Sequence, residues 1–129
     1  MIDHVTIYVK DLSKSRLFYL QAFKPLGYTI AFEKEEIFCA FDIGSGSLFE
    51  IAQYQGNEPI TRCHVAFRAA SEDQIREFHA SALQAGGIDH GAPGPRPEYT
   101  QNYYACFILD PDGHNIELMH DQWKTVSAF

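Results

Sequence analysis

Two histidines and two glutamates occupy matching places in two similar stretches of the chain. His4 and His64 each open a short alternating apolar run, HVTIYV and HVAF, and Glu50 and Glu117 each lie inside a later run of the same kind. Imidazole nitrogen and carboxylate oxygen are ligands that suit divalent transition metals. We therefore predict that these residues hold a divalent metal ion, with zinc or nickel preferred and cobalt, manganese or iron as further options.

The alternation also predicts which way the four side chains point. Neighbouring residues of a strand face opposite sides, so His4 shares a face with Thr6 and Tyr8 and opposes the valines and isoleucine of its run. His64, Glu50 and Glu117 likewise point away from the most apolar side of their strands. If the apolar sides pack under helices, the four polar side chains line the concave side of the sheet, where a cation would offset their burial.

A lone histidine on a strand is more often a hydrogen-bonded structural residue than a ligand, but four candidate ligands on matching faces favour a shared role. The four remaining histidines are predicted to be surface or hydrogen-bonded residues, because they lie on the predicted helix, in a loop, in a turn and past the final strand: His79, His90, His114 and His120.

The elements that must position the candidate ligands form an internal repeat. His4 and His64, Phe18 and Phe78, and Gly27 and Gly87 are each sixty residues apart. Each copy carries a first strand, a helix and three further strands, so we predict an α+β fold of two βαβββ modules in a single domain over residues 1–129. The predicted modules span about 1–58 and 59–123, followed by a tail at 124–129. Further strands are predicted at 27–34, 37–44, 47–54, 87–92, 103–110 and 114–120.

Each predicted helix has a start signal and an apolar stripe. Asp11 or Ser13 can cap the first helix, and Ser71 caps the second. The predicted buried stripes are Leu17, Leu20 and Phe23 in the first helix and Ile75, Phe78, Ala82 and Leu83 in the second. We also expect the tail residues Trp123 and Phe129 to pack on a neighbouring surface.

Composition excludes several classes of partner. The net charge of −7 disfavours nucleic acid, whose phosphates are bound by clustered basic side chains. No apolar run is long enough for a membrane span, and no secretory signal is seen, so we expect a cytoplasmic protein without membrane contact. The three cysteines, Cys39, Cys63 and Cys106, are predicted to be buried thiols in a reducing compartment.

The opening DHVTIYVKDLSKSRLFY, the mid-chain CHVAFRA and the closing FILDPDGHNIELMH together resemble the vicinal oxygen chelate superfamily. This superfamily includes glyoxalase I, extradiol dioxygenases, fosfomycin-inactivating enzymes and bleomycin-resistance proteins. The resemblance covers nearly the whole chain and implies a cup-shaped half-barrel with helices on its outer face. It also implies a homodimer, in which one site can draw ligands from two subunits. By this resemblance, His4 and His64 correspond to the metal ligands on the first strands of the two modules, and Glu117 corresponds to the carboxylate ligand on the last strand. Glu50 falls where glyoxalase I has its fourth protein ligand.

The resemblance also implies an activity of the lyase or isomerase class. The metal would chelate adjacent oxygens of a small substrate and stabilise an enolate, while Glu50 moves the proton. By analogy with glyoxalase I, the substrate would be the hemithioacetal of an α-ketoaldehyde. However, Tyr8 stands where glyoxalase I has an arginine that grips glutathione. Two alternatives remain open, namely a metal-free protein that sequesters a small molecule, as in bleomycin resistance, and an Fe(II) dioxygenase without Glu50 as ligand.

An insertion in the second copy is a candidate for substrate recognition. The segment GAPGPRPEYTQN at 91–102 is rich in proline and glycine and is followed by Tyr103. It is predicted either to cover the cleft with Arg96, Tyr99 and Tyr103, alongside Tyr8, or to be a plain surface connection. Arg96 or Arg68 could replace the positive charge that Tyr8 does not supply.

Overall fold

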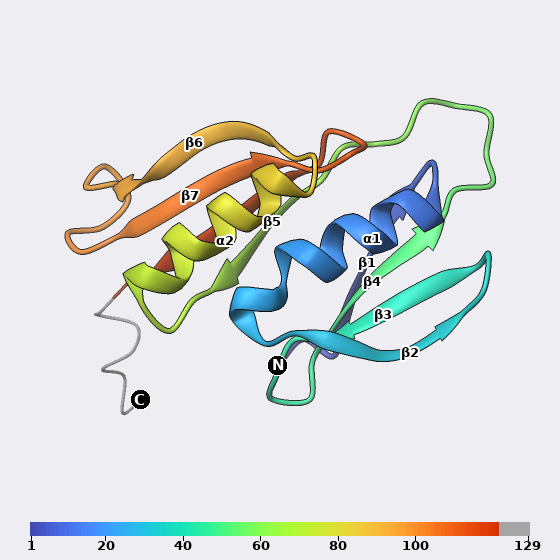
Figure 1. The fold of residues 1–129 in the computed structure, drawn as a ribbon, viewed down its shortest axis with the longest axis horizontal. Helices are drawn as coiled ribbons and strands as arrows, with labels where there is room; N and C mark the ends of the chain where they lie inside the picture. Colours follow the sequence, from blue (N-terminus) through green and yellow to red (C-terminus); the bar gives the residue numbers. More distant parts are fainter. Residues whose placement is uncertain (122–129) are drawn as a thin grey trace.

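Each half of the chain forms a four-stranded sheet with one helix against it (Figure 1). The computed structural model describes residues 1–121, so the predicted packing of Trp123 and Phe129 lies outside the described residues. Module 1 comprises β1 (His4–Val9), α1 (Leu12–Ala22), the short 3-10 helix η1 (Lys24–Leu26), β2 (Thr29–Lys34), β3 (Phe38–Asp42) and β4 (Leu48–Gln53). Module 2 comprises β5 (His64–Arg68), α2 (Glu72–Gln84), β6 (Ile88–Pro95), β7 (Tyr104–Leu109) and β8 (Asn115–His120).

The two sheets have the same topology. Their strand orders are β1-β4-β3-β2 and β5-β8-β7-β6, and in each the first strand runs parallel to the last while the other pairs are antiparallel. In register, Thr6 lies opposite Glu50 and Ala66 lies opposite Glu117. The predicted α+β fold of two βαβββ modules is therefore confirmed, and this topology places each first-strand histidine beside its last-strand glutamate.

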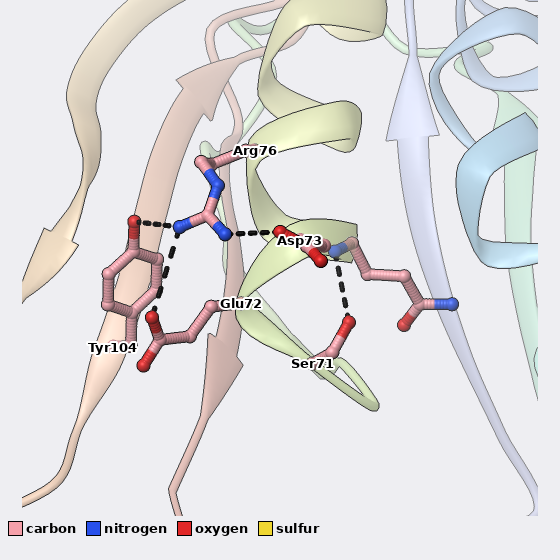
Figure 2. Close-up of polar contacts among 6 residues, drawn as sticks. Ser71, Glu72, Asp73, Arg76 and Tyr104 are labelled. Atoms are coloured by element: carbon pink, nitrogen blue, oxygen red, sulfur yellow. Dashed lines mark hydrogen bonds and ion pairs between the residues drawn. The ribbon is translucent and has the colours of Figure 1, made fainter.

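The second helix is fixed at its start and along one side. Ser71 Oγ accepts from Gln74 N at 3.2 Å, as the sequence predicts for an N-cap. Arg76, one turn further, donates to Tyr104 Oη at 3.0 Å and pairs with Asp73 (Figure 2). Its guanidinium also lies over the Tyr104 ring, so α2 is attached to β7. Within the described residues, neither helix is long and apolar enough to cross a membrane.

The helix stripe predicted for module 1 is wrong in part. The N-cap is Asp11, whose carboxylate accepts from Lys14 N, but Leu17 is 65% exposed. The buried side of α1 is instead made by Phe18, Tyr19 and Ala22. In α2 the predicted Ile75, Phe78 and Ala82 are buried, whereas Leu83 is 38% exposed. Of the stripe predicted for α1, Phe23 is fully buried and Leu20 is partly buried against the core, so the error concerns Leu17.

The two modules share one aromatic core. Phe23 at the end of α1 packs against Phe67 of β5, with ring centroids 5.5 Å apart, and Phe49 of β4 lies 5.1 Å from the same ring. Cys39 and Cys106 are buried in this core as predicted, whereas Cys63 is only partly buried. The helices and the core-facing sides of both sheets thus form a continuous apolar interior.

A buried polar cluster in the turn before β8 also joins the modules. Tyr19 Oη donates to Asp110 Oδ2 at 2.6 Å, and His114 N donates to Asp110 Oδ1. His114 Nδ1 accepts from Cys63 N at 2.9 Å, so its Nε2 carries the proton and donates to Tyr8 O at 2.8 Å. Burial raises the pKa of the Asp110 carboxyl and of the Tyr19 hydroxyl. His114 is thus a structural histidine, as predicted.

Replacing Tyr19 with phenylalanine should lower the free energy of unfolding by about 1–3 kcal/mol, because the buried Asp110 carboxyl loses a hydrogen-bond donor while the ring remains. Urea denaturation at neutral pH measures the effect. Tyr99→Phe is the matched control, because Tyr99 is 56% exposed and its substitution should change stability by no more than about 0.5 kcal/mol. Equal stability of Tyr19→Phe and the parent protein would contradict a stabilising role for this contact.

Candidate functional site

The first pair of candidate ligands lies on the face of the module 1 sheet that points away from α1. Thr6 Oγ1 donates to Glu50 Oε1 at 3.0 Å, which orients the carboxylate beside β1. His4 Nδ1 donates to Asp3 Oδ1 at 2.8 Å. This hydrogen bond, with the nearby charge of Glu50, raises the pKa of His4. His4 is about half exposed, and its Nε2 is left with an available lone pair when the ring is neutral.

The second pair occupies the equivalent place in module 2. His64 Nδ1 donates to the Asn115 carbonyl oxygen at 3.0 Å, and His64 Nε2 lies 3.0 Å from Glu117 Oε1. Tyr103 Oη donates to Glu117 Oε2 at 2.5 Å. Glu117 is only 4% exposed, so its carboxyl group is held firmly between His64 and Tyr103.

The hydrogen bonds of His4 and His64 indicate whether these histidines and the neighbouring glutamates could bind a metal ion. A backbone carbonyl only accepts, so the His64 proton is on Nδ1, and the contact between Nε2 and Glu117 then requires one more proton on either group. A divalent cation bound by both groups would take the place of that proton. His4 is held in the same way, with Nδ1 bonded to a carboxylate, an arrangement that commonly orients metal-binding histidines. The residues present therefore fit a divalent metal ion.

One chain brings the four candidate ligands together as two pairs. Within residues 1–121, no group of three or more histidine, cysteine, aspartate or glutamate side chains is close enough to hold one metal ion. We call His4 with Glu50 the module 1 half-site and His64 with Glu117 the module 2 half-site. The assignment of these residues as metal ligands remains a prediction.

Aromatic side chains surround both half-sites. Tyr8 is 53% exposed on the same face as His4, and Phe32 is also about half exposed. In module 2, Phe107 lies opposite Glu117 in register and stacks on His64, with centroids 6.2 Å apart. Our sequence analysis named Tyr8 but missed Phe32 and Phe107, although Phe107 could have been found from its alternation with the other residues of its strand.

The predicted loop at 91–102 is in part a strand. β6 runs to Pro95, and Gly94 pairs with Ala105 of β7, so about half of the insertion belongs to the sheet. Two register shifts near Gly91 accommodate the irregular sequence, and β6 is an edge strand, where proline is tolerated. The remaining part of the insertion brings Tyr99 against Tyr103, with ring centroids 5.1 Å apart.

The two arginines proposed as a source of positive charge differ in the structure. Arg96 donates to Ala92 O at 2.7 Å and to Pro95 O, and its guanidinium lies over the Phe107 ring. Arg96 is thus bound to its own segment. Arg68, in contrast, makes no side-chain hydrogen bond or ion pair within residues 1–121.

Comparisons with known proteins agree with this fold. The family model of the Glyoxalase/Bleomycin resistance protein/Dioxygenase superfamily matches residues 1–118. A glyoxalase/bleomycin resistance protein from Albidiferax ferrireducens is 27% identical, with a TM-score of 0.83, over 94% of this chain and 99% of that one. A lactoylglutathione lyase from Agrobacterium tumefaciens is 17% identical, with a TM-score of 0.72, over 95% of each chain. A glyoxalase-related enzyme from Fulvimarina pelagi, 17% identical over 95% of this chain and 88% of that one, has a TM-score of 0.74. No curated protein sequence matches the chain significantly.

Proposed function

The chain belongs to the glyoxalase/bleomycin resistance protein/dioxygenase superfamily, and on that premise we propose that it is a metal-dependent, glyoxalase-like enzyme. Its substrate would be a small molecule with two adjacent oxygen atoms. The observation that carries the proposal is the pair of equivalent half-sites, each with a histidine whose Nδ1 is bonded to an oxygen and a glutamate alongside. Zinc or nickel is the preferred ion, with cobalt, manganese or iron as alternatives.

We further propose that the protein acts as a homodimer. Each site would combine the module 1 half-site of one subunit with the module 2 half-site of its partner. The separation of the candidate ligands into two pairs within residues 1–121 supports this arrangement. A two-fold axis would then produce two identical sites, each with two histidines and two glutamates.

The two glutamates are suited to different tasks. Glu117 is buried and bonded by Tyr103, which favours a fixed ligand, whereas Glu50 is partly exposed and bonded by Thr6. A bound divalent ion would supply Lewis-acid stabilisation of negative charge on adjacent substrate oxygens. Glu50 would take a proton from the carbon beside one of these oxygens and return it to the neighbouring carbon, which is an isomerisation. Tyr8 and Phe107 would keep water from the reacting atoms.

Turnover by metal-loaded protein tests this function. The protein is stripped of metal, loaded with Ni²⁺, Co²⁺, Zn²⁺ or Mn²⁺, and assayed with hemithioacetals of α-ketoaldehydes formed from glutathione and from thiols without a carboxylate. We expect turnover with at least one ion, and loss of turnover in Glu50→Gln even at metal concentrations high enough to keep its site loaded through the remaining ligands. Absence of turnover with all four ions, while a known glyoxalase is active in the same assay, would contradict the proposal.

A second candidate is a metal-free protein that sequesters a flat small molecule. The exposed aromatic side chains near the half-sites, Tyr8, Phe32 and Tyr99, favour it. Metal analysis of protein purified without chelators separates the two candidates, together with His4→Ala. A sequestering protein would contain no metal and would keep its ligand binding in the variant. Bound iron would instead favour the dioxygenase alternative.

A further inference from the structure

A groove of about 510 Å³ lies between the modules, away from the paired histidines and glutamates. One wall is formed by Tyr28 and the turn between β3 and β4, and the other by the end of β5 with His120 of β8. Arg68 lies in this groove, at the opposite end of β5 from His64. Arg68 follows His64 by four positions, which corresponds to about 13 Å along the strand. None of the four half-site residues lines the groove, although Arg68 is close enough to Tyr103 for its charge to act on the hydroxyl that binds Glu117.

The groove contains hydrogen-bond donors that the described residues leave unused. The Arg68 guanidinium and the hydroxyls of Tyr28 and Ser45 make no hydrogen bond within residues 1–121. A tyrosine hydroxyl is protonated at neutral pH and can donate, and burial raises the pKa of Tyr28 further. A guanidinium offers several donors in one plane, a geometry that matches carboxylate and phosphate oxygens.

The charge of the groove contrasts with that of the whole chain. The sequence has seventeen acidic residues and a net charge of −7, yet none of the residues that line the groove is acidic. Asp42 immediately precedes the turn, but its carboxylate accepts from Gly44 N at 2.9 Å and does not line the groove. The permanent charge within the groove is the single positive charge of Arg68, which selects for anions.

Apolar surface lies beside this charge. Ile43 and the Tyr28 ring are partly exposed in the groove, and the Tyr28 ring packs on the buried Phe67, with ring centroids 6.1 Å apart. An inorganic ion would leave this surface exposed to water, whereas a ligand with an apolar body would cover it. The combination of one cation, free hydroxyls and an aromatic wall therefore fits an organic acid better than a simple ion.

We propose that this groove is a binding site for a small organic anion, a carboxylate or phosphate ester, whose anionic group pairs with Arg68 and whose apolar body packs on Tyr28 and Ile43. The site is formed within one chain and does not require the metal centre. It would therefore bind its ligand even if the function proposed above were wrong.

Isothermal titration calorimetry with phenyl phosphate, benzoate and inorganic phosphate tests the proposal on the full chain, stripped of metal and dialysed. We expect saturable one-site binding of phenyl phosphate or benzoate, and weaker binding of inorganic phosphate. Arg68→Gln should weaken binding of the organic anion by about tenfold or more, because a charge-assisted hydrogen bond is lost. The matched control is Lys14→Gln, which removes one positive charge from an exposed position on α1. The affinity of Lys14→Gln for the organic anion should stay within about twofold of that of the parent protein, because exposed charges are screened by salt.

Two results would overturn the proposal. One is the absence of saturable binding of both phenyl phosphate and benzoate to the parent protein. The other is an equal loss of affinity in Arg68→Gln and Lys14→Gln, which would show attraction by overall charge and not by this groove. Arg68 is exposed, so its substitution should leave the melting temperature nearly unchanged. Preference for phenyl phosphate or for benzoate distinguishes a phosphate ester from a carboxylate as the natural ligand class.

Discussion

Replacing Glu117 with glutamine is expected to weaken the binding of Zn²⁺ or Ni²⁺ by about a hundredfold or more, because the proposed metal site would lose an anionic ligand that is already held in place. The carboxyl group is buried, lies 3.0 Å from His64 Nε2 and accepts a hydrogen bond from Tyr103. The glutamine amide keeps the size of the side chain but carries no negative charge. The loss therefore reports on coordination and not on packing.

Competition with a metal-sensitive dye measures this affinity, and two variants serve as comparisons. Tyr103→Phe keeps the carboxylate but removes the hydroxyl that orients it, so a smaller loss of about tenfold is expected. Glu77→Gln removes an exposed carboxylate from α2 and should leave the affinity unchanged. If Glu117→Gln binds the metal as tightly as the parent protein, then Glu117 is not a ligand.

Mixing two inactive variants is expected to restore activity if each site is shared between subunits. One variant carries His4→Ala with Glu50→Gln and has no module 1 half-site. The other carries His64→Ala with Glu117→Gln and has no module 2 half-site. Either homodimer has only incomplete sites, but a mixed dimer has one complete site and one with no ligands. Random pairing would give about a quarter of the parent number of sites, because half of the dimers are mixed and each has one complete site of two.

Co-expression or joint refolding of the two variants, followed by measurement of bound metal and turnover, provides the test. Each variant alone should show neither bound metal nor turnover. The control mixes two variants that both lack the module 2 half-site, which should remain inactive in any combination. A mixture of the complementary variants that binds no metal would contradict a site shared between subunits.

The parts of the fold that could be predicted from the sequence are those with a simple periodic signal. Alternation along the first strands correctly placed His4 and His64 on faces away from the core, and the cap signal correctly located the start of α2 at Ser71. The place of Leu17 in the α1 stripe was wrong because Leu17 and Phe18 each begin an apolar series with helical spacing. The choice between them depends on what the helix packs against, and a single sequence does not contain that information.

The surroundings of the candidate ligands were harder to predict for a different reason. Asn115 orients His64 through its backbone carbonyl, and every residue type has such a group, so no sequence signal exists. Asp3 and Thr6 bond to His4 and Glu50, but small polar residues near a strand are too common to indicate this role. The separation of the four candidate ligands into pairs follows from strand pairing within each module, which the sequence repeat implies only indirectly.

The shared aromatic core has a mechanical consequence for the proposed dimer. Phe67 of module 2 packs against Phe23 and Phe49 of module 1, and His114 bonds to the backbone of both modules. In the proposed dimer, each chain would be a rigid connection between two different sites. A shift of one strand on substrate binding would be transmitted through this rigid core to the other site, so communication between the two sites would run through the interior of each subunit.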